Sequence, residues 1–257
     1  MKLNYVEQGT GSPVILMHGM FGSLSNLGNL ARALVTHYRV ISVDLRNHGD
    51  SPHEQRMDLD VMATDIVELL DALEINSAVL IGHSLGGKVA MQVAMNYANR
   101  VACLVVADIS PVDYPEQNNS PVISALEQLS EGVVESRQGA DAVLAEYQID
   151  ASTRAFILKN LRRSSAGQFE LKLNVESIAA NYGNRLVLAP KGEPYAGPTL
   201  FLKGQHSAYI QDKHRPTIEN LFPNSDLQLI DDVGHWLHAE KPQVFNSLVY
   251  GFLNANL

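Results

Sequence analysis

The chain has 257 residues, of which 46% are hydrophobic and 18% are charged, and its formal net charge at pH 7 is −9. This length and composition are typical of a soluble globular protein and argue against disorder. The acidic balance argues against nonspecific binding to nucleic acid, which needs clustered lysine and arginine, and against docking on anionic lipid surfaces. The single cysteine, Cys103, lies in an apolar run, so an intramolecular disulfide is excluded and we expect a buried thiol.

The first residues, Met-Lys-Leu-Asn-Tyr, lack the long apolar core of a signal peptide. No later run approaches the roughly 18 apolar residues of a membrane helix. We therefore expect a cytoplasmic protein without integral membrane association, and the sequence leaves its oligomeric state open.

Short apolar segments alternate with amphipathic segments along the first hundred residues. We predict strands and helices, in chain order, at residues 14–17, 27–35, 39–44, 59–73, 78–81, 88–97 and 101–107. The alternation resumes with a strand at 199–203, a helix near 211–221, a strand at 227–230 and a final helix at about 242–253. This order is typical of βαβ units and predicts an α/β fold with a mostly parallel central sheet flanked by helices.

Residues 111–195 interrupt this alternation. The segment opens with a Pro- and Asn-rich run at 111–121, and then has the pattern of several helices, including 141–147 and 153–161. We interpret it as an inserted helical cap, or lid, which would gate access to a site at the sheet edge and exclude water from it. The core would then consist of residues 1–110 and 196–257.

The sequence Gly82-His83-Ser84-Leu85-Gly86-Gly87 lies between a predicted strand and a predicted helix. It matches the G-x-S-x-G pattern, in which a serine occupies a sharp turn and nearby glycines leave room that Cβ atoms would fill. The turn also directs the first amides of the helix toward the group that the serine attacks. We therefore predict that Ser84 is a nucleophile.

A serine nucleophile needs a base, preferably a histidine that a carboxylate orients. Among the nine histidines, His235 is the best candidate, because it follows the strand at 227–230 and precedes the last helix. This agrees with the chain order serine, acid, histidine that is known for elbows of this kind. His238, three residues later, is the alternative.

The acid is less clearly indicated. In most proteins with an elbow and a cap of this kind, the acid lies in the loop after the strand that follows the cap. Here that loop has Ser207 where an aspartate would be expected. Asp108 ends the strand before the cap, one strand nearer to Ser84, and we predict it to be the acid. Asp113 and Asp212 remain alternatives.

Acyl transfer also needs two hydrogen-bond donors for the oxyanion of the tetrahedral intermediate. The backbone N–H of Leu85, directly after the nucleophile, is the first candidate. We assign the second to the backbone N–H of Met20 in the loop His18-Gly19-Met20-Phe21-Gly22-Ser23, which follows a predicted strand. The neighbouring Phe21 is a candidate wall of an acyl pocket.

Other motifs are weaker. We interpret the stretch 44–51 as a loop whose Asp, Arg and Gly residues shape the sheet edge. No metal-ligand spacing, dinucleotide-binding glycine motif or phosphate-binding loop is present in the sequence, so we expect no metal and no cofactor. Lys159, Arg162 and Arg163 could bind an anionic leaving group such as coenzyme A, or form a solvated helix face.

The His18-Gly19 loop, the stretch 44–51, the elbow and Gly234-His235-Trp236 together resemble the α/β-hydrolase superfamily over essentially the whole chain. The sequences VADISPVDY at 106–114 and GHWLHAEKP at 234–242 more narrowly resemble the bacterial YbfF-type esterases. In that group the acid follows the earlier strand, so the resemblance supports Asp108. It also implies hydrolysis of short- to medium-chain acyl esters, with acyl-CoA thioesters among the substrates.

We therefore expect a serine esterase with Ser84 as nucleophile, His235 as base and Asp108 as orienting acid, acting through an acyl-enzyme on a small ester or thioester. One alternative is the same triad on another substrate, as in carbon–carbon bond hydrolases or haloperoxidase-like perhydrolases. Another is a ligand-binding receptor that keeps the hydrolase fold but turns over little. Fold resemblance alone does not choose among these functions.

Overall fold

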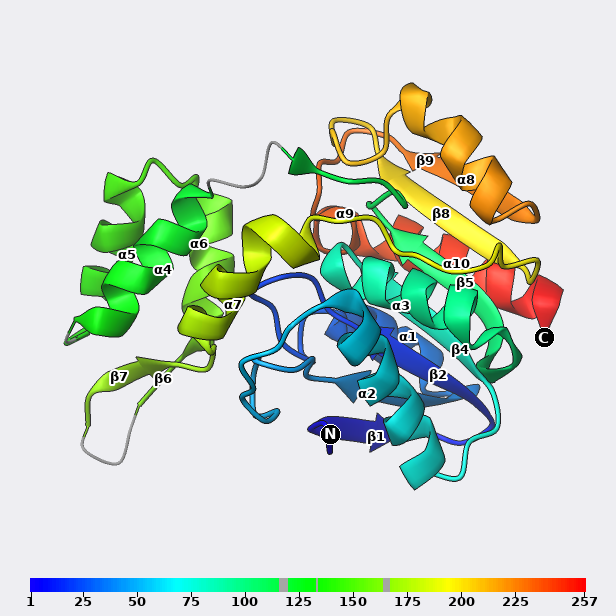
Figure 1. Ribbon diagram of the computed structural model, residues 1–257, viewed down its shortest axis with the longest axis horizontal. Helices are drawn as coiled ribbons and strands as arrows, with labels where there is room; N and C mark the ends of the chain where they lie inside the picture. The colour runs from blue at the N-terminus through cyan, green and yellow to red at the C-terminus, as the bar shows by residue number, and fades with distance from the viewer. Residues whose placement is uncertain (116–119, 133, 164–166) are drawn as a thin grey trace.

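The computed structural model describes residues 1–115, 120–132, 134–163 and 167–257, so part of the Pro- and Asn-rich run at 111–121 lies outside the described residues. Within the described residues, seven strands form one sheet in the order β1-β3-β2-β4-β5-β8-β9 (Figure 1). Strand β1 is antiparallel to β3, and the other neighbouring strands of this sheet are parallel. The strands are Tyr5–Gln8 (β1), Ser12–Met17 (β2), Tyr38–Val43 (β3), Ala78–His83 (β4), Val101–Ala107 (β5), Thr199–Gly204 (β8) and Ser225–Ile230 (β9).

Helices cover both faces of this sheet. Successive residues of a strand point to opposite faces, and in the central strands both sets of residues are apolar, so both faces must be buried. In β2, for example, Val14 and Leu16 pack on one face, whereas Ile15 and Met17 pack on the other. The first face is covered by α1 (Gly28–Leu34), α9 (Leu237–Glu240) and α10 (Pro242–Asn256). The second is covered by α2 (Leu59–Ala72), α3 (Leu85–Asn96) and α8 (Arg215–Leu221). The predicted α/β fold is confirmed.

Short 3-10 turns connect some of these elements, namely η1 (Ala98–Arg100) after α3 and η5 (Asp212–His214) before α8. Helix α2 begins where the Asp58 carboxylate accepts a hydrogen bond from the Val61 amide at 3.0 Å, as an N-cap residue does. Helix α3 is buried along residues 85–95, so both of its sides contact protein. This burial fixes the helix that begins directly after Ser84.

The segment between β5 and β8 forms a separate group of elements beside the sheet (Figure 1). We call residues 121–186 the cap. Its elements are α4 (Pro121–Glu131), α5 (Arg137–Glu146), α6 (Ala151–Ile157), η3 (Leu158–Asn160), β6 (Leu161–Arg163), β7 (Phe169–Leu171), α7 (Val175–Asn181) and the π-helical turn η4 (Tyr182–Leu186).

The helix predicted at 153–161 is confirmed as far as Asn160, by α6 and the 3-10 turn η3, and is wrong at Leu161. Helix α6 ends at Ile157, and residues 161–163 instead form β6, which pairs with the antiparallel strand β7. Arg162 therefore lies on a hairpin rather than on a helix face, and its side chain pairs with Glu170 at 2.6 Å and with Asp50 at 3.4 Å. None of the helices in the described ranges combines the length and apolar character needed to cross a bilayer.

Candidate active site

Ser84 lies on the turn between β4 and α3. Its backbone has φ +52° and ψ −116°, a conformation that is costly for a residue with a Cβ and that persists only where the surroundings hold it. Its amide donates to the carbonyl of Ala107 at 2.9 Å, which ties the turn to the end of the neighbouring strand β5. A Cβ on Gly82 would lie 2.1 Å from the carbonyl oxygen of Gly86, so the turn can close only with glycine there.

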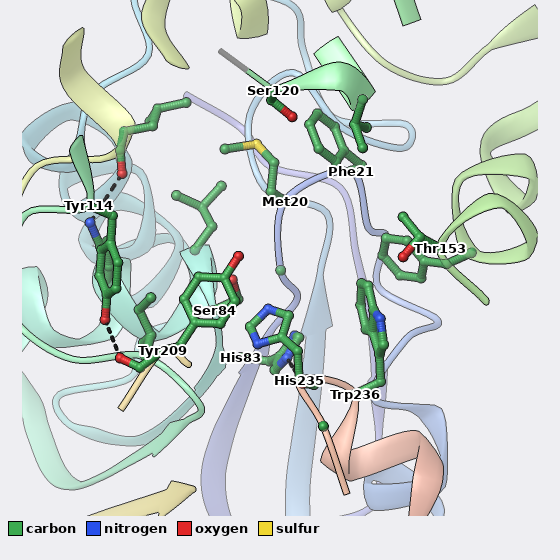
Figure 2. A pocket seen from close by; sticks show the side chains of 18 of the residues that line it. Met20, Phe21, His83, Ser84, Tyr114, Ser120, Thr153, Tyr209, His235 and Trp236 are labelled. Carbon is green, nitrogen blue, oxygen red and sulfur yellow. Dashed lines mark hydrogen bonds between the residues drawn. The ribbon is translucent and has the colours of Figure 1, made fainter. Parts of the chain in front are cut away.

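A cavity of about 550 Å³ lies above this turn (Figure 2). Core residues Ser84, His235 and Met20 line it on one side, and cap residues Phe156 and Tyr182 line it on the other. A cavity of this size can hold a small organic ligand. The predicted nucleophile and the predicted base therefore face the same space.

His235 is held on several sides. Its Nδ1–H donates to Asp108 Oδ2 at 2.7 Å, which leaves Nε2 as the basic nitrogen. Its ring stacks on Tyr209, with ring centroids 4.1 Å apart and planes at 26°. Its backbone carbonyl accepts a hydrogen bond from Nε2 of His83 at 2.9 Å. Burial lowers the pKa of His83 well below its usual value, so this neighbour stays neutral beside His235.

The alternative base, His238, lies outside the cavity lining. It is buried, and its ring packs against His83 with centroids 4.4 Å apart. Burial lowers its pKa to about 4. A neutral, enclosed imidazole at this position packs behind the site rather than facing a substrate.

Asp108 follows β5 and is completely buried, with φ +53°. One carboxylate oxygen, Oδ1, accepts from the Gly204 amide at 3.1 Å. The other, Oδ2, accepts from His235 and also from the hydroxyl of Ser207. The buried charge is thus fully hydrogen-bonded, as burial of a carboxylate requires.

The two other candidate acids contact different groups. Asp113 accepts a hydrogen bond from the amide of Ala189 at 2.6 Å. The side chain of Asp212 is 92% exposed and pairs with Arg215 at 3.4 Å. Of the three aspartates, Asp108 is the one that contacts His235.

Sequence reasoning gave Ser207 no role, although its position was conspicuous. The hydroxyl of Ser207 fills the place on the loop after β8 where an aspartate was expected, and it donates to Asp108, which comes from the preceding strand of the sheet. The sequence did hold a signal for this hydrogen bond: a serine stands where the acid is usually found, and an aspartate stands after the earlier strand.

Residues 19–22 form a tight turn beside Ser84, in which the Gly22 amide donates to the Gly19 carbonyl at 3.0 Å. That carbonyl also accepts from Nδ1 of His18 at 2.7 Å. Because the C=O and N–H of a trans peptide point in opposite directions, holding the Gly19 carbonyl fixes the direction of the Met20 N–H. A Cβ on Gly19 would lie 2.8 Å from Nδ1 of His83, so glycine allows this close approach.

Two buried histidines support the 19–22 turn. His18 Nε2 accepts from the Leu45 amide at 3.0 Å, and His48 Nε2 accepts from the Phe21 amide at 3.1 Å. Nδ1 of His48 donates to the Arg46 carbonyl at 2.9 Å. Burial is the main cause that lowers the pKa of His18 to about 4 and that of His48 to about 3. Both rings are therefore neutral, with one donor and one acceptor nitrogen each.

The rest of the stretch 44–51 shapes the loop, as expected from the sequence. Asp44 Oδ1 accepts from the Leu24 amide at 2.7 Å, and Asp44 Oδ2 accepts from the Asp50 amide at 3.0 Å. Arg46 forms a buried, two-pronged ion pair with Asp65 at 2.6 and 2.8 Å. The support that His48 gives to Phe21 was not predicted.

Lys159, Arg162 and Arg163 are absent from the cavity lining. Arg163 lies over the ring of Phe169, 5.2 Å from its centroid. Within the described ranges, no group of three or more histidine, cysteine or acidic side chains is arranged to hold a metal ion.

Comparison with known proteins agrees with the fold described above. The family model of the alpha/beta hydrolase fold matches residues 12–242. The chain is 40% identical to the sn-1-specific diacylglycerol lipase ABHD11 of Mus musculus, over 93% of this chain and 80% of the relative. It is 36% identical to esterase YbfF of Escherichia coli (strain K12), over 99% of this chain and 100% of the relative. A solved structure titled marine microorganism esterase matches with a TM-score of 0.92 and 36% identity, over 98% of this chain and 99% of that one. The chain therefore belongs to the α/β-hydrolase fold family and is a serine hydrolase.

Proposed function

We propose that the protein hydrolyses short- to medium-chain acyl esters through an acyl-enzyme on Ser84. The observation that supports this most is the 2.7 Å hydrogen bond from His235 Nδ1 to Asp108 Oδ2, beside a serine on a strained turn that faces the same cavity. A serine, a histidine oriented by a buried carboxylate, and an adjacent cavity are the parts that acyl transfer needs.

In the first half of the proposed reaction, Ser84 Oγ attacks the ester carbonyl carbon while His235 Nε2 accepts the serine proton. The carbonyl oxygen becomes an oxyanion, and the amides of Met20 and Leu85 donate hydrogen bonds to it. Asp108 stabilises the imidazolium that forms. The carbon–oxygen bond to the alcohol then breaks, and the alcohol leaves with the proton from His235.

In the second half, His235 takes a proton from a water molecule, whose oxygen attacks the acyl-serine carbonyl. The same two amides stabilise the second oxyanion. Collapse of this intermediate breaks the bond to Ser84 Oγ, which recovers its proton from His235. The products are a carboxylic acid and an alcohol, and the enzyme is regenerated.

The cavity walls support an acyl chain as the group that is bound. Phe21, Phe156 and Trp236 present rings to the cavity, and the rings of Phe156 and Trp236 lie 4.2 Å apart where the cap meets the core. We propose that Phe21 contacts the acyl chain. The 40% identity to a relative named diacylglycerol lipase supports testing acylglycerols beside simple esters. Acyl-CoA thioesters stay within the proposal, because the same chemistry cleaves them.

We also propose that the chain divides into a core of residues 1–110 and 196–257 and an inserted domain of residues 111–195, which contains the cap elements at 121–186. The support for this division is that one cavity has walls from both parts, with Ser84 and His235 on one and Phe156 on the other. A cap in this position would control substrate entry and exclude water.

The test is hydrolysis of p-nitrophenyl esters of graded chain length, acylglycerols and acyl-CoA thioesters by wild type and Ser84→Ala, measured side by side. We expect turnover by the wild type and its loss in the variant, and the optimal chain length reports the size of the acyl pocket. If the folded wild type hydrolyses none of these substrates, or if Ser84→Ala keeps its activity, the proposed function is wrong.

A further inference from the structure

The backbone of Phe21 is held from two sides by residues distant in the sequence. Its N–H donates to Nε2 of His48 in the core at 3.1 Å, and its C=O accepts from Nδ2 of Asn160 in the cap at 2.6 Å. Phe21 has φ +59°, in the left-handed region that an aromatic residue rarely adopts. Such a conformation persists only where neighbouring groups hold it. His48 and Asn160 are those groups.

Asn160 is a rigid donor. It lies in η3, its side chain is buried, and its Nδ2 also donates to the carbonyl of Ile157 at 3.0 Å. Both amide protons therefore have acceptors, one within the cap and one on the turn beside Ser84. A second cap residue, Tyr182, stacks on the ring of Phe21 with centroids 6.5 Å apart.

Phe21 is the residue directly after Met20, and both lie in the tight turn of residues 19–22. Rotation of the backbone at Phe21 would reorient the peptide that joins Met20 to Phe21. It would thereby move the Met20 Cα, to which the peptide carrying the Met20 N–H is also attached, because successive peptide planes share a Cα atom. An oxyanion donor loses most of its value when it is displaced from its aligned position.

We propose that Asn160 is a positioning residue through which the cap holds the 19–22 turn, and hence the Met20 amide, in its catalytic conformation. The inference rests on the proposed function, since it assigns Met20 as an oxyanion donor. It gives the cap a second task beside covering the cavity: the hydrogen bond to Phe21 forms only when the cap lies against the core.

The chain contains a matched control. Asn181 is also a buried cap asparagine, and its Nδ2 donates to the carbonyl of Gln55 in the core at 2.9 Å and to that of Ser177 in its own helix at 2.7 Å. It therefore has the same chemistry as Asn160, with one bond to a core backbone and one within the cap. It contacts Gln55 instead of the 19–22 turn.

The test compares Asn160→Leu with Asn181→Leu. The readouts are kcat and KM for an ester that the wild type hydrolyses, affinity for a trifluoromethyl ketone that forms a tetrahedral adduct with Ser84, and the rate of Ser84 labelling by a fluorophosphonate. We expect Asn160→Leu to lower kcat, ketone affinity and labelling rate by roughly 10- to 100-fold with little change in KM. We expect Asn181→Leu to change each by less than about three-fold.

Equal losses in the two variants, or a change in KM alone, would overturn the positioning role and leave Asn160 as a cap anchor only. If Asn160→Leu does not fold, the isosteric pair Asn160→Asp and Asn181→Asp is measured in the same way, since aspartate also lacks the amide protons. The labelling rate needs no known substrate. A wild type that is labelled at Ser84 but hydrolyses no ester would therefore contradict the proposed function, while the comparison of variants still tests Asn160.

Discussion

The hydroxyl of Ser207 donates to Oδ2 of Asp108, the same oxygen that accepts the hydrogen bond from His235. The two donors come from the loops after β8 and β9, whereas the carboxylate comes from the end of β5. Ser207 thus fixes the rotation of the carboxylate that orients the imidazole. With Asp108 as the proposed acid, the carboxylate would come from one strand earlier than the loop after β8, where Ser207 lies.

Ser207→Ala should lower kcat by roughly ten-fold and leave KM within about two-fold, because the carboxylate loses one of its buried donors but stays bonded to the Gly204 amide. Ser207→Thr keeps the hydroxyl and serves as the control. Steady-state kinetics on one ester substrate measure both. Full activity in Ser207→Ala would show that the Gly204 amide alone suffices to orient Asp108.

Asp108→Asn should lower kcat by roughly 10⁴-fold with the fold intact, because the amide stabilises the wrong tautomer of His235. Asp113→Asn and Asp212→Asn should stay within about three-fold of wild type, since their side chains bond to Ala189 and Arg215 instead. Kinetics and circular dichroism of the three variants provide the check. A major loss in either of the latter two, with Asp108→Asn active, would reassign the acid.

Gly19→Ala should lower kcat by roughly ten-fold or more, because the added Cβ would lie 2.8 Å from His83 Nδ1 and 3.2 Å from Ser84 Cβ. The turn would have to move away from Ser84. Gly251→Ala is the control, since a Cβ there meets nothing within 4 Å and the residue lies in α10. Normal kcat in Gly19→Ala would mean that the turn can shift without affecting the chemistry.

Acid should destabilise the fold as the pH falls below about 6.5. Burial lowers the pKa of His18 to about 4 and that of His48 to about 3, from 6.5 for both. Between pH 6.5 and these lowered values, the unfolded chain binds protons on the two histidines that the folded protein does not bind. The contribution of the two neutral rings to stability is therefore fully present above about pH 6.5 and is lost progressively as the pH decreases. Each tenfold difference in the proton affinity of a group between the folded and unfolded states changes the free energy of unfolding by about 1.4 kcal/mol.

The measurement is the free energy of unfolding in urea at about pH 7.5 and about pH 5, for wild type and His48→Gln. We expect a decrease of a few kcal/mol in the wild type and a smaller decrease in the variant, even though the variant is less stable at the higher pH. The same pH dependence in both proteins would show that His48 does not contribute to it.

The strand–turn–helix of the elbow and the strand before His235 could be predicted because each leaves a local signal. An apolar strand, a glycine turn and a helix start lie within about ten residues around Ser84, and His235 follows the last strand directly. Strand β1 was missed because it is short and lies at the sheet edge with Val6 exposed. An edge strand of this kind lacks the apolar pattern that reveals a buried one.

Asn160 and His48 were missed for a different reason. The bond from Asn160 to Phe21 joins residues 139 positions apart, and the bond from Phe21 to His48 joins residues 27 apart. Neither contact is recorded in periodicity, composition or spacing along the chain. The helix predicted at 153–161 stops one residue early, at Asn160, because Leu161 pairs with Leu171 of β7 and this pairing overrides the local preference.

The proposed function requires that Ser84 become acylated during turnover. The most direct measurement mixes wild type with a p-nitrophenyl ester, stops the reaction in acid within milliseconds, and locates the added acyl mass by peptide mass spectrometry. We predict an acyl group on the peptide that contains Ser84, formed with a burst of p-nitrophenol and absent in Ser84→Ala. Rapid ester hydrolysis with no adduct at Ser84, undiminished in Ser84→Ala, would contradict an acyl-enzyme on Ser84.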